Sequence, residues 1–384
     1  MIVIWGGRKV NQNEKKINVL FVHNSIPEYR IEFWRQLGNE INLDILVTRT
    51  GLEEKIYGLE KNVTGLNITP YTTSINLEGL VEKYDIIILP PVDSILEYKV
   101  ALRLKFIAKS KKKKYIYWTE KWVPDIKLQP LKKRIKNVIQ GLLIKSVAQG
   151  ADYCIAAGSK SAEYYDLLGI NKDKVRIAYD SSTSPELKEH IDIREKYKIG
   201  EKKIILYFGR IVERKGPDVL IEACKDILKK NNSVLLMCGE GEYIDECKMM
   251  AKGYPIIFAG KIQPAIRRAF YQQSDVFVLP SYCKDGNCEA WGLTVNEAIE
   301  CGTPVISTTA VGAAYDILEN SREAGMMVKE KDIKILRNAI ETVLDGTMKY
   351  NRNTIKKYYQ KFSIREMSDS FLKIFNETQC KSKI

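Results

Sequence analysis

The sequence predicts an α/β protein with two parallel-sheet domains, and three observations support this. The chain has 384 residues, whereas a single hydrophobic core stops growing at roughly 250–300 residues. Short apolar runs typical of buried strands alternate with segments of helical periodicity, which is the pattern of parallel βαβ units. This alternation stops at a polar, proline-containing segment, 181–195, and then begins again. We therefore expect two successive domains joined by a linker.

The N-terminal half predicts six strands after a leader, residues 1–16. Each is a short run rich in β-branched and aliphatic residues, as expected for strands buried on both faces of a parallel sheet. The predicted strands are 17–24, 42–48, 84–91, 113–120, 151–158 and 174–179. They define an N-terminal domain over residues 17–185.

The C-terminal half repeats the pattern with five strands. The first ends the segment 195–210, and the others are 234–241, 255–260, 276–281 and 303–308. Helical segments such as 216–230 and 264–273 lie between them, so the second domain covers 186–352. The remaining segment, 353–384, contains one predicted helix over about 353–377. This helix is a candidate for packing back onto the first domain.

The composition is that of an ordinary soluble globular protein, with 45% hydrophobic and 28% charged residues. The formal net charge is +13. Nucleic acid, an anionic membrane surface or a phosphorylated substrate would each account for this charge, and so would lysines that are only solvated. The charge alone does not choose among them.

The cysteines and histidines argue against a metal site. The chain has eight cysteines and two histidines. Cys283 and Cys288 have a C-x4-C spacing, but no second pair at zinc spacing follows. No secretory signal is recognisable, and no apolar run approaches the ~18 residues that span a bilayer. These features predict a cytoplasmic protein with reduced thiols.

A basic loop follows the first strand of the second half. In open parallel sheets, ligands bind outside the carboxyl ends of the strands. The segment GRIVERKG begins there and contains Gly209, Arg210 and Lys215. Arginine can pair with two phosphate oxygens and lysine supplies a point charge, so the loop is suited to a diphosphate. The alternative is a solvated basic loop. Gly239 follows the next strand in GEGEY, which lacks the third glycine of a dinucleotide fingerprint and predicts a turn beside a ligand.

A second candidate loop, YCKDGNCEAWG, leads into a helix that begins near Leu293. Backbone amides at a helix start attract phosphate or sugar oxygens, and Gly292 keeps that approach free of side-chain bulk. Glu297 lies one turn into the helix, where a carboxylate is a strong acceptor for sugar hydroxyls. The alternatives are a solvated helix residue for Glu297 and, for Glu289, complementarity to the helix dipole worth ~0.3–1 kcal/mol.

Three segments, in this order and spacing, resemble family 4 retaining glycosyltransferases. They are FGRIVERKGPDVLIEA (208–223), EAWGLTVNEAIECGTPVIS (289–307) and VGAAYDILENSREAGMMV (311–328). The second resembles the E-x7-E signature of that family. The resemblance implies the GT-B fold, in which two Rossmann-like domains face an interdomain cleft with their parallel sheets. It also implies a hexosyltransferase that uses a nucleotide diphosphate-sugar as donor, without a metal or a further cofactor.

The resemblance assigns roles to individual residues. Arg210 and Lys215 are expected to hold the diphosphate and to stabilise it as a leaving group, while Glu289 orients the donor sugar. Glu297 is expected to bind the ribose hydroxyls. The predicted donor-binding residues are Gly209, Arg210, Lys215, Gly239, Gly292, Leu293, Thr294 and Glu297.

The N-terminal half departs from the family pattern. Its first loop reads HNSIPEYRIEF without a glycine pair, and YWTEKW carries Glu120 where many members have a histidine. Glu120 is therefore a candidate for contact with the sugar, or else a surface or interdomain acid. His23 ends the first strand and is a second candidate, with a packed or solvent-facing histidine as the alternative.

A basic amphipathic helix is predicted over 131–149. Its apolar residues recur at helical spacing on one stripe, and most of its lysines lie outside that stripe. The stripe comprises Leu131, Ile135, Val138, Ile139, Leu142, Leu143 and Val147. One interpretation is a helix packed on the core with a solvated basic face. The other is a helix at an anionic membrane surface, close to a lipid-linked acceptor.

The function predicted from these features is transfer of a hexose to a glycan or lipid-linked acceptor, in bacterial surface polysaccharide biosynthesis. We expect a cytoplasmic enzyme that is peripheral on the inner face of the cell membrane, with no nucleic-acid partner. Two alternatives remain on the same fold, namely a nucleotide-sugar epimerase and a non-catalytic nucleotide-sugar-binding subunit. A dinucleotide-dependent oxidoreductase is disfavoured by the incomplete glycine fingerprint.

Overall fold

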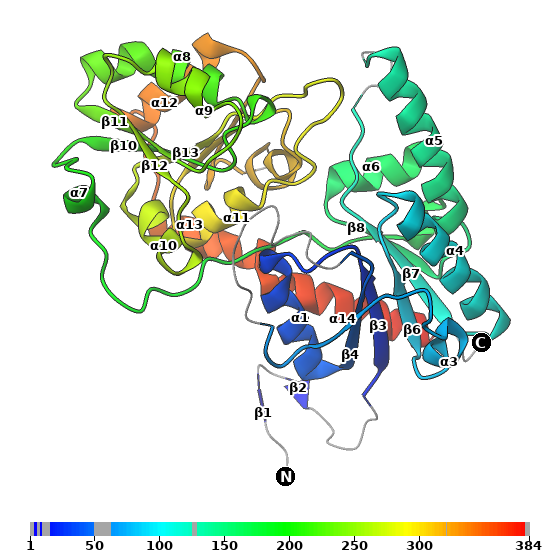
Figure 1. Cartoon of the computed structure of the whole chain (residues 1–384). Helices are drawn as coiled ribbons and strands as arrows, with labels where there is room; N and C mark the ends of the chain where they lie inside the picture. The colour runs from blue at the N-terminus through cyan, green and yellow to red at the C-terminus, as the bar shows by residue number, and fades with distance from the viewer. Residues whose placement is uncertain are drawn as a thin grey trace. The chain divides into compact units, whose positions relative to one another are not determined.

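The computed structural model describes residues 16–49, 63–124, 129–319 and 321–380, together with strands β1 (Ile4–Trp5) and β2 (Arg8–Lys9). Apart from these two strands and residue 16, the predicted leader lies outside the described residues. The chain forms two compact units. The first comprises Met1–Trp118, Val147–Tyr153 and Leu372–Ile384, and the second comprises Thr119–Ser146 and Cys154–Phe371. Figure 1 shows the parallel sheets on which the fold is built.

The first sheet has seven strands in the order β5-β4-β3-β6-β7-β8-β9. Their bounds are β3 Asn18–His23, β4 Asn42–Val47, β5 Asn67–Pro70, β6 Ile86–Leu89, β7 Lys114–Thr119, β8 Tyr153–Ala156 and β9 Val175–Ile177. The pairings of β3 with β4 and β6, of β4 with β5, of β6 with β7 and of β8 with β9 are parallel. Six strands agree with the prediction. The seventh, β5, was missed because it is a short, largely exposed edge strand without an apolar run.

The second sheet has six parallel strands in the order β12-β11-β10-β13-β14-β15. Their bounds are β10 Lys203–Phe208, β11 Ser233–Cys238, β12 Ile256–Gly260, β13 Val276–Leu279, β14 Val305–Thr308 and β15 Gly325–Val328. Five of these strands were predicted. The strand β15, again at an edge, is only four residues long and gave no distinct pattern. The prediction of two parallel-sheet α/β domains is confirmed.

Helices connect the strands of both sheets (Figure 1). In the first half these are α1 Glu28–Glu40, α3 Leu77–Val81, α4 Ile95–Ser110, α5 Leu131–Ala148 and α6 Ser159–Leu167. In the second half they are α7 Ile193–Lys196, α8 Pro217–Lys230, α9 Ile244–Met250, α10 Pro264–Gln273, α11 Leu293–Glu300 and α12 Ile333–Leu344.

The second sheet has a hydrophobic core on each face. Side chains alternate between the two faces of a strand, so Ile204 and Leu206 of β10 join one core while Ile205 and Tyr207 join the other. The first core contains residues of α10 and α11, and the second contains residues of α8, α9 and α12. Burial on both faces is what makes these strands continuous apolar runs in the sequence.

The C-terminal segment contains two helices where one was predicted. Helix α13 covers Arg352–Tyr359 and α14 covers Ile364–Cys380, with a 3-10 turn, Gln360–Phe362, between them. Ser363 has an extended backbone and its hydroxyl accepts a hydrogen bond from the amide of Glu366 at 3.2 Å. Such a serine cap starts a new helix. The docking predicted for this segment and the predicted domain limits stay predictions.

Helix α5 exposes the apolar stripe that one interpretation placed in the core. Leu131, Ile135, Val138, Ile139 and Leu142 are 71%, 52%, 47%, 52% and 62% exposed. The buried side of the helix is formed instead by Asn137, Gly141 and Ile144, with Val147 and Ala148 at its end. Core packing is therefore wrong for most of the stripe, because these five aliphatic side chains lie on the exposed side of the helix.

Candidate functional site

The candidate loops of the second half lie at one edge of its sheet. Strand β10 pairs with both β11 and β13, and all three are parallel. Their carboxyl ends therefore meet, and with them the loop 209–216 after β10, the glycines after β11 and the loop 280–292 after β13. The second sheet thus brings together segments that are up to about 80 residues apart in the sequence.

The first two loops pack backbone against backbone. The amide of Gly209 donates to the carbonyl of Cys238 at 3.0 Å, and the amide of Gly239 donates to Gly260 at 2.8 Å. Gly239 has a φ of +134°, and a Cβ atom there would collide with the carbonyl group of Gly209. Close loop packing by itself requires this glycine, so its contact with a ligand stays a prediction.

Glu289 is the centre of a cluster of charges. One oxygen of its carboxylate, Oε2, lies 2.5 Å from Nζ of Lys215 and 2.9 Å from Nη1 of Arg214. Their side chains are 17%, 12% and 27% exposed respectively, so the cluster is largely withdrawn from water. Among the described residues, no hydrogen bond to the other oxygen, Oε1, is found. The sequence identified Lys215 and Glu289 but missed Arg214, although it is adjacent to Lys215.

The cluster keeps Glu289 ionised. Burial raises the pKa of Glu289, but the charges and hydrogen bonds of Lys215 and Arg214 outweigh it and lower the pKa from 4.5 to about 2. The pKa of Lys215 is lowered as well, because burial and the neighbouring Arg214 and Arg210 outweigh the attraction of Glu289. Lys215 and Arg214 together carry one positive charge more than Glu289 balances, which favours the binding of a further anion beside them.

The backbone around Glu289 is held on both sides. Its amide donates to the carbonyl of Ala310, and its carbonyl accepts from the amide of Gly312, each at 2.9 Å. Trp291 follows, 3% exposed, and its Nε1 donates to Asn296 at 2.8 Å. These bonds fix the loop from which the Glu289 side chain extends.

The start of α11 follows directly. Gly292 caps this helix with a φ of +104°, and a Cβ atom there would lie 2.8 Å from Cγ1 of Val311 and 3.1 Å from Cδ2 of Leu279. The first amides of a helix have no partner within the helix. The amides of Leu293 and Thr294 are therefore suited to an anion, as the sequence predicts.

Glu297 is buried rather than solvated. Its side chain is 5% exposed, Oε1 accepts from Nη1 of Arg267 at 2.7 Å, and Oε2 accepts from the hydroxyl of Tyr271 at 2.8 Å. Burial and this carboxylate raise the pKa of Tyr271. The alternative of a solvated helix residue is wrong. Arg267 and Tyr271 were missed, although their i,i+4 spacing in the predicted helix 264–273 places them on one helix face.

Among the described residues, Arg210 forms no ion pair with the charge cluster, although its charge acts on Lys215. Its side chain is exposed, and within the described part of the chain no ion pair is found for it. Its carbonyl accepts a hydrogen bond from the hydroxyl of Tyr207 at 2.7 Å, which holds the backbone of the loop. The diphosphate role of Arg210 stays a prediction.

The two candidates from the N-terminal half are in different environments. His23 is 6% exposed, its Nδ1 lies 2.9 Å from the carbonyl oxygen of Ser25, and its ring packs against Trp34 at 5.6 Å between centroids. Burial, aided by the charge of Arg30, lowers its pKa to about 3. It is the packed, neutral histidine of the alternative interpretation. Glu120 is half-buried directly after β7, and its role stays a prediction.

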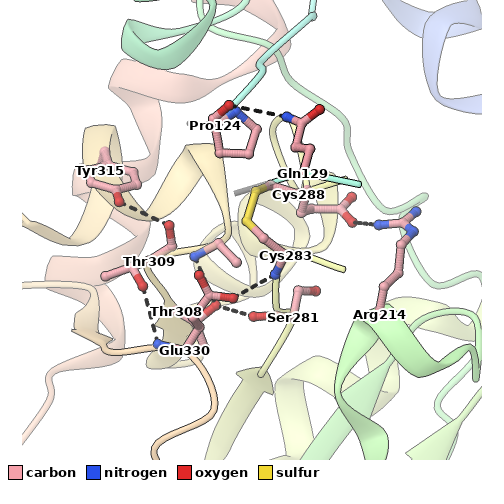
Figure 2. The surroundings of a disulfide bond; sticks show 12 residues. Pro124, Gln129, Arg214, Ser281, Cys283, Cys288, Thr308, Thr309, Tyr315 and Glu330 are labelled. Carbon is pink, nitrogen blue, oxygen red and sulfur yellow. Dashed lines mark hydrogen bonds and ion pairs between the residues drawn. A yellow bond between two sulfur atoms is a disulfide. The ribbon is translucent and has the colours of Figure 1, made fainter. Parts of the chain in front are cut away.

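A disulfide closes the loop just before Glu289 (Figure 2). It joins Cys283 and Cys288, whose Cα atoms are 4.3 Å apart, so the prediction of reduced thiols is wrong for this pair. The amide of Cys283 donates to Oε2 of Glu330 at 2.6 Å, and Lys284 pairs with Glu213. The loop is thus fastened to the segment that carries Arg214 and Lys215.

Neither a metal cage nor a membrane-spanning helix is found in the part of the chain that the structure describes. No three His, Cys, Asp or Glu side chains are grouped so as to hold a metal ion there. None of the described helices is long and apolar enough to cross a membrane.

The second half of the chain is similar to a known family. Residues 189–361 match the family described as Glycosyl transferases group 1. The chain is 26% identical over 241 residues to an uncharacterized glycosyltransferase of Methanocaldococcus jannaschii, covering 59% of this chain and 60% of that protein. It is 26% identical over 168 residues to a GDP-mannose-dependent alpha-(1-6)-phosphatidylinositol monomannoside mannosyltransferase of Mycolicibacterium smegmatis, covering 42% and 44%. The chain thus spans 60% or less of these two curated relatives.

Solved structures share the fold over nearly the whole chain. Anabaena HepE in complex with UDP superposes with a TM-score of 0.72 at 14% identity, over 94% of this chain and 100% of that chain. The fold is therefore the GT-B fold, as the sequence resemblance implied. The charge cluster lies within residues 189–361, the region that matches this family of glycosyltransferases.

Proposed function

We propose that this protein is a retaining glycosyltransferase of family 4 that transfers a hexose from a nucleotide diphosphate-sugar to a glycan or lipid-linked acceptor. The observation that carries the proposal is the cluster of Arg214, Lys215 and Glu289 at the carboxyl edge of the second sheet. It lies inside the region that matches the glycosyltransferase family.

The charges of the cluster complement a diphosphate. Two cations share one carboxylate, and Arg210 adds a third positive charge that acts on Lys215. Each phosphate of a nucleotide diphosphate-sugar carries one negative charge, so the surplus positive charge matches the donor. As the glycosyl bond breaks, the leaving diphosphate gains a further charge, which Lys215 and the amides of Leu293 and Thr294 would stabilise.

The reaction exchanges one bond of the anomeric carbon for another. The bond to the diphosphate oxygen breaks, and its electron pair stays with the diphosphate. The acceptor hydroxyl oxygen bonds to the same face of the carbon, and its proton passes to the leaving diphosphate. In this proposal Oε1 of Glu289 accepts a hydrogen bond from the donor sugar, and no metal ion takes part.

The donor site is tested by binding. A thermal-shift screen of UDP-, GDP- and ADP-sugars identifies a donor that raises the melting temperature, and calorimetry then gives its affinity. We expect Lys215→Gln to lower turnover. Glu297→Ala should lower the affinity for the donor about tenfold or more, since each substitution removes a charged partner. Unchanged binding and turnover in both variants would contradict the site.

Product analysis separates the alternatives. Transfer gives a glycosylated acceptor and a nucleoside diphosphate, in the presence or absence of a chelator, with the anomeric configuration of the donor retained by NMR. Interconversion of nucleotide sugars without an acceptor would favour the epimerase instead. Donor binding without any turnover would favour the non-catalytic subunit.

We also propose that α5 places the enzyme on an anionic membrane surface, where a lipid-linked acceptor of surface polysaccharide would be met. Five large aliphatic side chains of α5 are about half exposed or more. Lys132, Arg134 and Lys136 are exposed on the same helix. Burial of apolar side chains at the acyl boundary favours membrane binding. Each nearby lysine or arginine strengthens binding to an anionic surface by ~1 kcal/mol.

Vesicle sedimentation tests this surface. The full chain is expected to sediment with phosphatidylglycerol-containing vesicles and not with phosphatidylcholine alone. Ile135→Ser combined with Leu142→Ser should abolish the sedimentation. The matched control is Leu167→Ser combined with Met249→Ser, which changes side chains that are 73% and 62% exposed on other helices. Equal loss in both pairs would contradict the proposal.

A further inference from the structure

We propose that Arg214 is a positioning residue that holds Glu289 for the donor sugar, while Lys215 is the cation that serves the diphosphate. The proposal rests on the proposed function, because it divides the work of the donor site between neighbouring cations. It assigns to Arg214 a part in the recognition of the sugar rather than of the nucleotide.

The backbone of Arg214 is anchored to the loop that carries Glu289. Arg214 lies in the 3-10 turn Glu213–Lys215, and its carbonyl accepts a hydrogen bond from the amide of Tyr282 at 2.9 Å. The carboxylate of Glu213 accepts from the hydroxyl of Tyr282 at 3.2 Å and pairs with Lys284. The turn therefore grips the beginning of the loop 282–289.

The side chain of Arg214 reaches the other end of the same loop. Its Nη1 contacts Oε2 of Glu289 at 2.9 Å, across 75 residues of sequence. Arg214 thus fastens the first and last residues of one loop, and the disulfide Cys283–Cys288 closes the segment between them. A guanidinium held at its backbone and at its tip fixes the direction of the carboxylate that it binds.

The shared oxygen explains why a second cation is needed. Lys215 contacts the same oxygen of Glu289 at 2.5 Å. A lysine that turns toward a diphosphate gives up part of this contact, and a lone carboxylate would then be buried without a partner, which is costly. With Arg214 in place, Glu289 keeps one cation and its position throughout. Oxygen Oε1 then stays available for a sugar hydroxyl.

The test compares the affinities of the intact donor and of its nucleoside diphosphate by calorimetry on the full chain. The probes are UDP-glucose with UDP, or GDP-mannose with GDP, according to the screen. Arg214→Gln is expected to lower the affinity for the sugar nucleotide about tenfold or more, while the affinity for the nucleoside diphosphate stays nearly unchanged. Lys215→Gln is expected to weaken both, and Arg214→Lys to restore part of the sugar-dependent affinity.

A double-mutant cycle tests whether Arg214 acts through Glu289. In the Glu289→Gln background, Arg214→Gln is expected to change donor affinity little, because the partner that it holds is gone. The pH dependence gives a second readout. In Arg214→Gln the pKa of Glu289 should rise toward its usual 4.5, so the sugar-dependent affinity should weaken at a higher pH than in the wild type.

Arg337→Gln is the matched control. Arg337 is 28% exposed and pairs with Asp226 at 2.8 Å on other helices, so its loss should leave both affinities unchanged. The assignment is overturned if Arg214→Gln lowers the affinity for the nucleoside diphosphate as much as that for the donor. It is also overturned if the effects of Arg214→Gln and Glu289→Gln on donor affinity are fully additive. If Lys215→Gln and Glu289→Gln each leave the affinities for the donor and for the nucleoside diphosphate unchanged, the proposed donor site is itself contradicted.

Discussion

At the scale of a residue, Glu289 couples the charge cluster to the stability of the protein. Its pKa is lowered from 4.5 to about 2 in the folded chain. A lowered carboxyl pKa contributes stability that is fully present above pH 4.5 and is lost as the pH falls toward 2. The gain is smaller than this shift alone implies, because burial lowers the pKa of the partner Lys215.

We therefore expect the wild type to lose stability in acid more steeply than Glu289→Gln. Denaturant unfolding at a series of pH values from neutral to about pH 3 measures the difference in unfolding free energy between the two proteins. The difference should shrink steadily below pH 4.5. A difference that stays constant over this range would show that the ion pairs do not set the pKa of Glu289.

Gly292 gives a second prediction at this scale. Its φ of +104° is unfavourable for any side chain, and a Cβ atom would crowd Val311 at 2.8 Å. We expect Gly292→Ala to cost about 2–3 kcal/mol of unfolding free energy. Gly253→Ala is the control, since Gly253 has a φ of +81° and no atom within 4 Å of the added Cβ. It should cost only about 1 kcal/mol, and an equal loss in both variants would exclude the contact with Val311 as a cause.

At the scale of an element, the loop 283–288 differs from its sequence prediction. The C-x4-C spacing was interpreted only as a poor metal motif, whereas the structure joins the two sulfurs. Alkylation of the denatured protein should therefore modify two more cysteines after reduction than before, as counted by mass spectrometry. Equal counts would contradict the disulfide. Among the described residues the other cysteines form no disulfide, and all except Cys380 are buried.

The same loop predicts a local effect on stability. Closing so short a loop stabilises the fold by about 2 kcal/mol in the chain-entropy account. Cys283→Ser combined with Cys288→Ser should lower the unfolding free energy by about that amount. The control is Cys247→Ser, a buried free thiol in α9. Reductant should lower the unfolding free energy of the wild type but not that of the double variant. An equal effect of reductant on both proteins would contradict a structural disulfide.

At the scale of the whole molecule, Asn296 joins three distant segments. It is fully buried, its Oδ1 accepts from Trp291, and its Nδ2 donates to the carbonyl of Phe362 at 3.0 Å and of Asp180 at 3.3 Å. Asn296→Ala removes these three hydrogen bonds, while the carbonyl of Phe362 keeps the one from the hydroxyl of Ser181 at 2.6 Å. The loss leaves the buried indole N–H of Trp291 without this acceptor and should cost about 2–4 kcal/mol of unfolding free energy. Asn338→Ala, on the exposed side of α12, should cost under about 0.5 kcal/mol. Thermal and denaturant unfolding measure both.

The extent to which the sequence predicted the fold follows from burial. Strands covered on both faces are continuous apolar runs, and those of the two sheets were found wherever a strand has neighbours on both sides. The missed strands β5 and β15 lie at sheet edges. The split between α13 and α14 depends on a single serine cap at Ser363. A single capping hydrogen bond involves too few residues to change the hydrophobic periodicity from which helices are predicted.

The candidate site was predictable only as far as its motifs reach. Lys215 and Glu289 stand in recognisable segments. The contact of Arg214 with Glu289, and that of Arg267 with Glu297, join loops or helices separated by 75 and 30 residues. Such contacts depend on which strands are neighbours in the sheet, and local spacing does not contain that information. The exposed stripe of α5 was ambiguous for the same reason, since the helical pattern does not say which side meets the core.

The pairing of Lys215 and Arg214 with a carboxylate from the chain itself has a consequence for competition. In the empty protein Glu289 acts as a tethered counter-ion, present at a high effective concentration beside both cations. A free inorganic anion must displace this tethered rival and brings no other contacts to offset the exchange. A ligand that also engages Oε1 and the start of α11 leaves the carboxylate in use. The tethered carboxylate of Glu289 therefore lowers the affinity of the site for small anions more than for large ligands that make several contacts.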